Sequence, residues 1–247
     1  MPKGVVSNKT NLDLFQRNDV VNAYADAVYL TESERSIFDG DIGIGKAILD
    51  LGVGGGRTAK YLAPVSREYV GSDYSPAMVE AGRRNYPHLR FEVVDAVDLS
   101  RFANESFDVV LFSFNGLGNI GTHQERITCH REVHRVLKPG GLWIFSLHHA
   151  GSLFLRPQFP WRSAIGTLFR SVPRFLERIR FRAFWNGLDY HHIAAHGGMR
   201  NLLARRSRVK EEVDKVGFRM DRILGDDYPR PNIPVMTRWY YYVCRKC

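Results

Sequence analysis

The sequence predicts an α/β fold: a doubly wound, mostly parallel sheet of seven strands with an antiparallel edge strand. Two observations support this prediction. Between residues 47 and 147, short apolar runs alternate with helical patterns at a spacing typical of parallel strands joined by right-handed crossovers. Toward the C-terminus, residues 218–224 and 238–243 are two further strand-like runs close together in sequence, which favours an antiparallel pair at the sheet edge.

Each predicted element follows from a local pattern. Residues 11–38 place apolar side chains at helical spacing without Pro or Gly, which predicts a leading helix. Ser75 followed by Pro76 is a typical helix start, because Ser caps a free N–H and Pro fits the first turn. The run 107–112 is nearly all apolar, as expected of a strand covered on both faces. The other predicted strands are residues 47–51, 69–73, 91–95 and 142–147, and the other helices are 57–62, 124–137 and 209–216.

Composition limits the class of protein. The 247 residues are 44% hydrophobic and 25% charged, which is typical of a globular chain. The length suits one large α/β domain or two small ones, and we expect a single domain over residues 1–247. No apolar run reaches the roughly 18 residues that a membrane span requires. Three cysteines are too few for a disulfide framework, which favours a reducing, cytoplasmic location. The formal net charge of +9 favours anionic partners without selecting one.

Three predicted strands end in groups suited to a nucleoside. Asp50 precedes a turn with four glycines at residues 52–56, Asp73 ends the second strand and Asp95 ends the third. Ligands of open parallel sheets bind at the carboxyl ends of the strands, where a glycine turn lets the backbone approach closely and leaves N–H groups free. An acid after the second strand can accept hydrogen bonds from a ribose diol, and one after the third can accept from an adenine amine. Together they predict an adenosine-bearing ligand.

Five segments follow one another in the order of a known set of motifs. They are residues 48–58 (ILDLGVGGGRT), 73–78 (DYSPAM), 94–96 (VDA), 106–110 (SFDVV) and 132–141 (EVHRVLKPGG). As a set they resemble the motifs of class I, Rossmann-like S-adenosylmethionine-dependent methyltransferases of the small-molecule type. The glycine turn departs from the family's usual pattern at Val53 and Gly55 but keeps its other glycines.

The resemblance implies S-adenosylmethionine as cofactor and S-adenosylhomocysteine as product. The glycine turn would surround the methionine part, with Arg57 toward its carboxylate, and the residues after the fourth strand would lie near the sulfonium. For Arg57 a solvated helix arginine is the alternative, and for Tyr24 and Met78 it is core packing. The implied cofactor-binding residues are Tyr24, Asp50, Gly52, Gly54, Gly56, Arg57, Asp73, Tyr74, Met78, Asp95, Ala96, Ser113, Phe114 and Asn115.

A basic segment follows the fifth predicted strand. Between residues 156 and 210 the chain has eleven Arg and one Lys but only two acidic residues. In the family this position often holds substrate-binding or lid elements, so we expect a basic helical insertion over residues 150–206, with residues 1–40 as an N-terminal helical cap. Three interpretations of the insertion stay open: a lid packed on the domain or on a second subunit, an entrance for an anionic acceptor, and a membrane-surface helix.

Histidines supply the candidate catalytic groups. His148 and His149 follow the fifth strand at the ligand end and are candidate bases or substrate contacts, with polar loop residues as the alternative. Tyr190, His191 and His192 lie in the insertion and are candidate substrate-binding residues. The histidine spacing matches no metal signature, so no metal site is predicted.

These patterns favour an enzyme that transfers a methyl group to a nitrogen or oxygen of a small-molecule acceptor by in-line displacement, as a monomer or homodimer. The alternatives are an RNA or protein methyltransferase and a non-catalytic cofactor-binding protein of the same fold. The pI near 9.6 suits RNA, but no nucleic-acid module is recognisable, so no stable nucleic-acid partner is expected. A nicotinamide oxidoreductase is disfavoured because Arg57 stands where its motif, started at Gly52, requires glycine.

Overall fold

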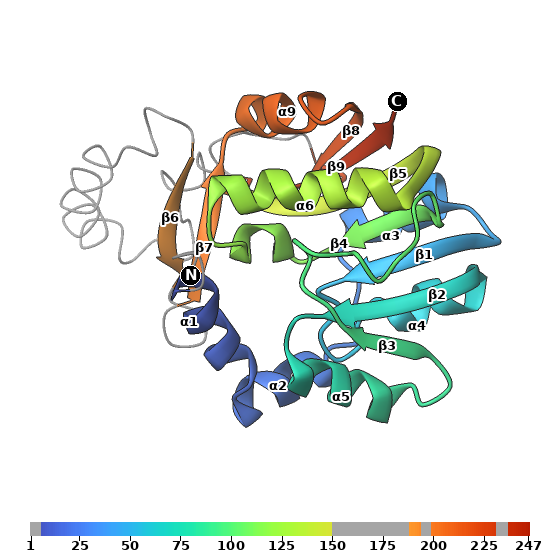
Figure 1. The fold of residues 1–247 in the computed structure, drawn as a ribbon, viewed down its shortest axis with the longest axis vertical. Coiled ribbons are helices and arrows are strands. Elements are labelled where there is room, and N and C mark those ends of the chain that lie inside the picture. The colour runs from blue at the N-terminus through green and yellow to red at the C-terminus, as the bar shows by residue number, and fades with distance from the viewer. Residues whose placement is uncertain (1–5, 150–187, 194–198, 231–236) are drawn as a thin grey trace.

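The computed structural model describes residues 6–149, 188–193, 199–230 and 237–247, and its elements follow the predicted alternation (Figure 1). The strands are β1 (Lys46–Leu51), β2 (Ser66–Asp73), β3 (Arg90–Val93), β4 (Phe107–Phe112), β5 (Leu137–His149), β6 (Leu188–Ile193), β7 (Met199–Ala204), β8 (Phe218–Gly225) and β9 (Trp239–Lys246). The α-helices are α1 (Val6–Phe15), α2 (Asn18–Ala25), α3 (Glu32–Ile37), α4 (Ala59–Leu62), α5 (Pro76–Asn85), α6 (His123–Val136) and α9 (Arg206–Asp214), and single helical turns are η1 (Phe38–Ile42), η2 (Ala63–Val65) and η3 (Gly116–Asn119).

The described strands form one sheet in the order β3-β2-β1-β4-β5-β7-β6, and β9 pairs with both β5 and β8. The pairs from β3 to β5 along this order are parallel. β9 runs antiparallel to β5 and to β8. The predicted doubly wound, mostly parallel sheet with an antiparallel edge is therefore confirmed.

Two strands arise in the stretch expected to be a helical insertion. β6 and β7 are an antiparallel pair, and β7 pairs in parallel with His148 and His149 of β5. The apolar run ends at Leu147, so the sequence predicts the strand end there, but the backbone of β5 continues and offers β7 an edge. The described residues thus contain nine strands where seven were predicted. The remainder of the predicted helical insertion, residues 150–187, lies outside the described residues.

Alternate strand residues divide the core between the two faces of the sheet. Leu49 and Val110 belong to a cluster with the apolar sides of α6 and α9, whereas Ile48 and Val109 belong to a cluster with α3, α4 and α5. Both clusters are buried, so the parallel strands are covered on both faces as their apolar sequences predict. No described helix is long and apolar enough to cross a membrane.

The predicted continuous helix over residues 11–38 is wrong. The segment is divided among α1, α2 and α3, and α3 starts at a capping box in which the Thr31 side chain accepts from the Glu34 N–H and Glu34 accepts from the Thr31 N–H. The Thr-x-x-Glu signal for this start lies in the sequence but is masked by the helical apolar spacing around it. The break matters because residues 26–31 form neither helix nor strand and connect α2, which packs on the glycine turn at Gly55, to α3.

Candidate functional site

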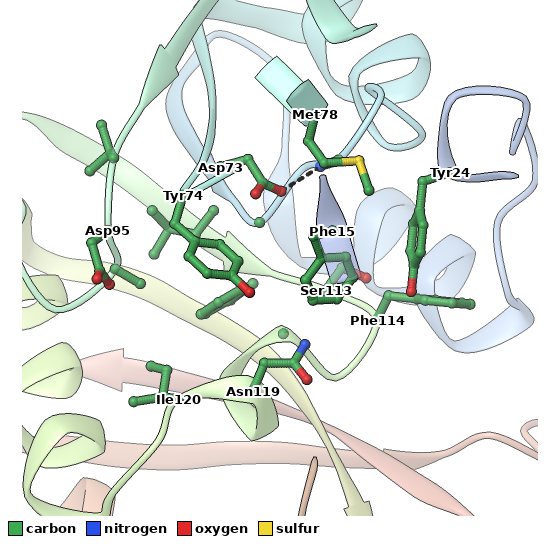
Figure 2. Close-up of a pocket in the computed structure, with 17 residues that line it drawn as sticks. Phe15, Tyr24, Asp73, Tyr74, Met78, Asp95, Ser113, Phe114, Asn119 and Ile120 are labelled. Atoms are coloured by element: carbon green, nitrogen blue, oxygen red, sulfur yellow. Dashed lines mark hydrogen bonds between the residues drawn. The ribbon is translucent and has the colours of Figure 1, made fainter. Parts of the chain in front are cut away.

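Two adjoining cavities lie at the carboxyl ends of β1 to β4. The cavity that reaches Asp95 is called the first cavity below. The second cavity reaches Asp50 and Arg57. Tyr24, Gly52, Ser113 and Phe114 border both cavities and mark their junction. Figure 2 shows the first cavity with Asp95 at one end and Ser113, Phe114 and Tyr24 at the other.

The glycine turn places backbone directly against this junction. Gly52 has a positive φ of 58°, and a Cβ there would lie 2.4 Å from the Phe112 ring. Only glycine combines this backbone conformation with so close an approach. Gly54 borders the first cavity, whereas the Gly56 Cα faces the Tyr86 ring and borders neither cavity.

Asp73 is a buried carboxylate that borders the first cavity. Its Oδ2 accepts from the Gly54 N–H at 3.0 Å and its Oδ1 accepts from the Ser75 N–H at 2.9 Å. Burial raises the pKa of Asp73 to about 6, against the effect of these hydrogen bonds. A carboxylate has about four lone-pair sites, so Asp73 keeps acceptor capacity for a ligand hydroxyl.

Asp95 and Ala96 form the far end of the first cavity. Asp95 is exposed, and its Oδ1 accepts from the Val97 N–H at 3.2 Å. Although the residue as a whole is exposed, protein atoms around the Asp95 carboxyl group desolvate it in part and raise its pKa. Between this end and the junction, Tyr74 and Met78 border the cavity from the α5 side and Ile120 from the η3 side. The Tyr74 hydroxyl is buried and has no hydrogen-bond partner among the described residues.

Asp50 carries an unsatisfied buried oxygen beside the second cavity. Its Oδ2 accepts from the hydroxyls of Thr58 at 2.5 Å and Tyr69 at 2.8 Å, whereas Oδ1 has no partner in the described part of the chain. Burial raises the pKa of Asp50 to about 6. A buried acceptor without a partner is costly, and a ligand ammonium would satisfy it.

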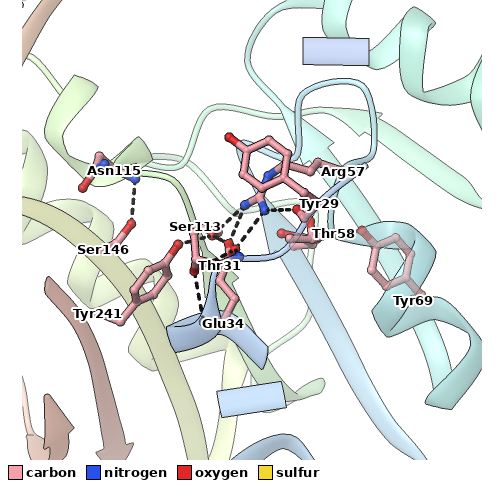
Figure 3. A network of polar contacts seen from close by, with 11 residues as sticks. Tyr29, Thr31, Glu34, Arg57, Thr58, Tyr69, Ser113, Asn115, Ser146 and Tyr241 are labelled. Atoms are coloured by element: carbon pink, nitrogen blue, oxygen red, sulfur yellow. Dashed lines mark hydrogen bonds and ion pairs between the residues drawn. The ribbon is translucent and has the colours of Figure 1, made fainter. Parts of the chain in front are cut away.

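A buried ion pair closes the second cavity from the side of α3 (Figure 3). Arg57 donates from Nη1 and Nη2 to the two carboxylate oxygens of Glu34, at 2.9 and 2.5 Å. Both side chains are buried, and Glu34 is fully inaccessible to solvent. The Ser113 hydroxyl donates to Glu34 and lies 3.2 Å from the Tyr241 hydroxyl. The guanidinium beside Glu34 holds the pKa of that carboxyl below its usual range, although burial opposes this effect.

The backbone after β4 adopts a conformation that is rare for residues with side chains. Phe114 and Asn115 have φ values of 54° and 64°. This corner is fixed because the Asn115 N–H donates to the Ser146 hydroxyl at 2.7 Å and the Arg57 guanidinium lies 4.8 Å from the centre of the Phe114 ring. Left-handed backbone at non-glycine residues is typical of functional sites. Asn115 itself is buried behind the corner and borders neither cavity.

The predicted catalytic and substrate residues lie apart from the two cavities. His148 and His149 are on β5 and border neither cavity; His148 packs edge-on against Trp239, and His149 Nδ1 is 3.2 Å from the Ala204 carbonyl. Burial lowers the pKa of His148 to about 4. Tyr190, His191 and His192 lie on β6, whose side chains are outside the described part of the structure.

The sequence analysis missed several residues that build the cavities. Phe15, Asn119 and Ile120 border the first cavity, and Tyr29 borders the second. The role of Glu34 at the site was not predicted, although the Thr-x-x-Glu pattern of its capping box is present in the sequence. No sequence pattern indicates that residue 34 contacts residue 57. Pairing of these side chains depends on the tertiary fold.

A sheet whose strand ends carry a glycine turn and successive acids is typical of α/β proteins that bind nucleoside cofactors. In a comparison with known protein families, residues 48–141 of this chain match the family described as Methyltransferase domain.

Individual proteins that are similar to this chain also carry methyltransferase names. A demethylmenaquinone methyltransferase of Paenarthrobacter aurescens is 30% identical over 170 residues, which are 68% of this chain and 63% of the relative. One from Clavibacter sepedonicus is 40% identical over 100 residues, 39% of each chain. This chain thus spans less than two thirds of the length of these relatives.

Solved structures share the fold at low sequence identity. The 1,6-didemethyltoxoflavin-N1-methyltransferase of Burkholderia thailandensis, solved with its substrate and S-adenosylhomocysteine, has a TM-score of 0.62 at 14% identity, covering 97% of this chain and 86% of that one. The CcbJ methyltransferase of Streptomyces caelestis has a TM-score of 0.63 at 16% identity, covering 95% of this chain and 98% of that one.

Proposed function

We propose that this protein transfers the methyl group of S-adenosylmethionine to a small-molecule acceptor. One observation carries the proposal: the two cavities meet at Gly52, and their polar groups match the two ends of the cofactor. Asp73 and Asp95 in the first cavity suit the ribose and adenine, and the unsatisfied Asp50 Oδ1 at the second suits the methionine ammonium. When bound, the cofactor supplies a methyl group already activated by the positive charge on sulfur.

The protein's own residues would then bind and orient the reactants. Asp73 accepts from the ribose hydroxyls and Asp95 from the adenine amine, with the Ala96 N–H beside the ring. Tyr74 and Met78 flank the adenine. Orientation supplies most of the rate gain in a displacement of this kind, because the acceptor must be held in line with the methyl group.

The junction residues would surround the reacting centre. Tyr24 and Phe114 present aromatic surface there, and Ser113 presents a hydroxyl that Glu34 and Arg57 hold in place. Aromatic faces attract a cation and exclude water from it. The catalytic role of His148 and His149 stays a prediction, since neither borders a described cavity.

The acceptor's chemistry is the finer part of the proposal. Phe15, Phe112 and Ile120 add apolar walls to the first cavity, which supports an acceptor with apolar surface. Two of the similar proteins are named demethylmenaquinone methyltransferase and 1,6-didemethyltoxoflavin-N1-methyltransferase. These names support a small molecule as the acceptor. The proposal also includes an anionic group on the acceptor, which the net charge of +9 favours. It further includes a cytoplasmic location, which the three free cysteines favour.

Calorimetry with S-adenosylhomocysteine and with NAD tests the cofactor part. We expect binding of the first and not of the second, and Asp73→Asn weakens it by about 1–3 kcal/mol because hydrogen bonds to the ribose are lost. Asp98→Asn is the matched control, because Asp98 is exposed and borders neither cavity. NAD binding alone, or equal affinities of wild type and Asp73→Asn, would contradict the proposal.

Transfer itself is tested with a cofactor that carries an isotope-labelled methyl group. The enzyme is incubated with a fraction of small metabolites, and separately with RNA and with protein. Mass spectrometry then shows where the label arrives. We expect it in the metabolite fraction; label only in RNA or protein would overturn the small-molecule assignment, and no transfer despite cofactor binding would indicate a non-catalytic binder.

A further inference from the structure

Residues 23–34, which we call the strap, contact the glycine turn at Gly55 and form a wall of the second cavity. Figure 3 shows Tyr29, Thr31 and Glu34 of the strap beside Arg57. Side chains from three positions that follow the strap in sequence donate to its backbone carbonyls. These hydrogen bonds are Asn85 Nδ2 to Ala25 at 3.0 Å, Tyr61 hydroxyl to Val28 at 2.7 Å and Arg57 Nη1 to Tyr29 at 2.9 Å. The strap is therefore fixed along its length by donors from the glycine turn, α4 and α5.

Gly55 lets the strap lie directly on the turn. A Cβ at this position would lie 2.4 Å from the Ala25 Cα, a backbone atom that cannot give way as a flexible side chain can. Asn85 also donates to the Gly55 carbonyl at 2.9 Å, so one amide joins the strap to the turn. Gly55 is one of the two positions where the sequence departs from the family's usual pattern, and its contact with the strap gives that departure a physical reason.

Arg57 is committed to the strap. Its four Nη hydrogens have four acceptors: both oxygens of Glu34, the Tyr29 carbonyl and the Ser113 hydroxyl at 3.1 Å. A guanidinium binds a ligand carboxylate best with two parallel N–H groups, and these are already used. Arg57 nevertheless borders the second cavity and packs against the Phe114 ring at the junction.

We propose that Glu34 and Arg57 are positioning residues whose ion pair latches the strap over the second cavity, so that binding of the cofactor's methionine end is coupled to docking of the strap. In this arrangement Arg57 acts through the strap and through Ser113, and not as a bidentate ligand of the cofactor carboxylate. The inference rests on the proposed function, because it takes the second cavity as the place of the methionine end.

Hydrogen–deuterium exchange and calorimetry with S-adenosylhomocysteine test this proposal together. In the wild type, we expect the ligand to slow amide exchange within residues 23–34. Glu34→Gln removes the charge that holds Arg57, and we expect about tenfold weaker binding together with faster exchange of the strap. Glu32→Gln is the control, because Glu32 lies on the same helix with an exposed side chain; its affinity and exchange should match the wild type.

Asn85→Ala separates a latch from a direct ligand and provides a second test if Glu34→Gln folds poorly. Asn85 borders neither cavity, yet it tethers Ala25. We expect about threefold weaker binding and faster strap exchange, in the same direction as Glu34→Gln. The latch would be overturned if the ligand did not change amide exchange in the strap, or if both variants bound S-adenosylhomocysteine with wild-type affinity. A wild type that does not bind S-adenosylhomocysteine would instead contradict the proposed function.

Discussion

The two cavities are built in different ways. The first cavity takes its acids from neighbouring strand ends, and Asp73 is held by N–H groups 2 and 19 residues away. The second cavity depends on Glu34, whose partners Arg57 and Ser113 are 23 and 79 residues away, and Ser113 contacts Tyr241 across 128 residues. The topology of the parallel sheet therefore places the acids of the first cavity, although Phe15 and Tyr24 from the N-terminal helices also line it. The second cavity takes more of its wall from the strap, which supplies Ala23, Tyr24, Ala27 and Tyr29.

This difference predicts that the second cavity is the more fragile half. Glu34→Ala should lower the free energy of unfolding by about 3–5 kcal/mol, because it leaves the Arg57 guanidinium buried without its carboxylate. Denaturant unfolding measures the loss. The control is Asp19→Ala, which breaks the exposed pair with Arg17 and should cost less than about 1 kcal/mol. Similar losses in the two variants would show that the buried pair gives no special support.

Gly55→Ala tests the same half through shape instead of charge. The added methyl group would meet the Ala25 backbone, so we expect a loss of about 1–3 kcal/mol in the free energy of unfolding and weaker S-adenosylhomocysteine binding. Gly45→Ala provides a contrast, since a Cβ there meets no atom within 4 Å and only its positive φ of 74° opposes the change. Weaker ligand binding should follow only the first substitution. If both variants bound S-adenosylhomocysteine equally well, contact between the strap and the glycine turn would not contribute to ligand binding.

The strand-end acids of both cavities could be predicted from the sequence, and the strap that lines the second cavity could not. Asp50, Asp73 and Asp95 were predicted to share one edge because each ends a strand of the same parallel sheet, and the structure places them at the two cavities. Glu34 has no such rule: its contact with Arg57 depends on where α3 packs. The long helix was predicted wrongly because apolar spacing outweighed the capping box, and β7 was missed because it pairs with the polar end of β5.

Asp50 belongs to the second cavity and Asp73 to the first, and both carboxylates have a pKa raised to about 6 by burial. As pH falls below this value both become protonated, so the affinity for S-adenosylhomocysteine should fall from pH 7 to pH 5 by about tenfold for each carboxylate that must be ionised. Stability of the free protein should change in the opposite direction. The folded state holds extra protons between about pH 4 and 6, so these groups lower the free energy of unfolding as pH rises through that range.

Calorimetry and denaturant unfolding over this range measure both trends. The asparagine in Asp50→Asn cannot titrate. This substitution should therefore reduce the pH dependence of both the ligand affinity and the free energy of unfolding, and the remaining pH dependence should come from Asp73. An affinity that is constant between pH 5 and 7 would contradict the assignment of these carboxylates to the ligand. If only Asp50→Asn changed the slope, the pH dependence would belong to the second cavity alone.

The smallest effect is expected outside both cavities, at His148. Its ring packs against Trp239, so His148→Asn should leave the affinity for S-adenosylhomocysteine within about twofold of the wild type. Turnover then decides the predicted catalytic role. Because burial lowers the pKa of His148 to about 4, the histidine is neutral at pH 7, and a base of this kind would give a step in the rate near pH 4 and none near the ordinary histidine value. Full turnover in His148→Asn and in the matching His149→Asn would reject both as bases.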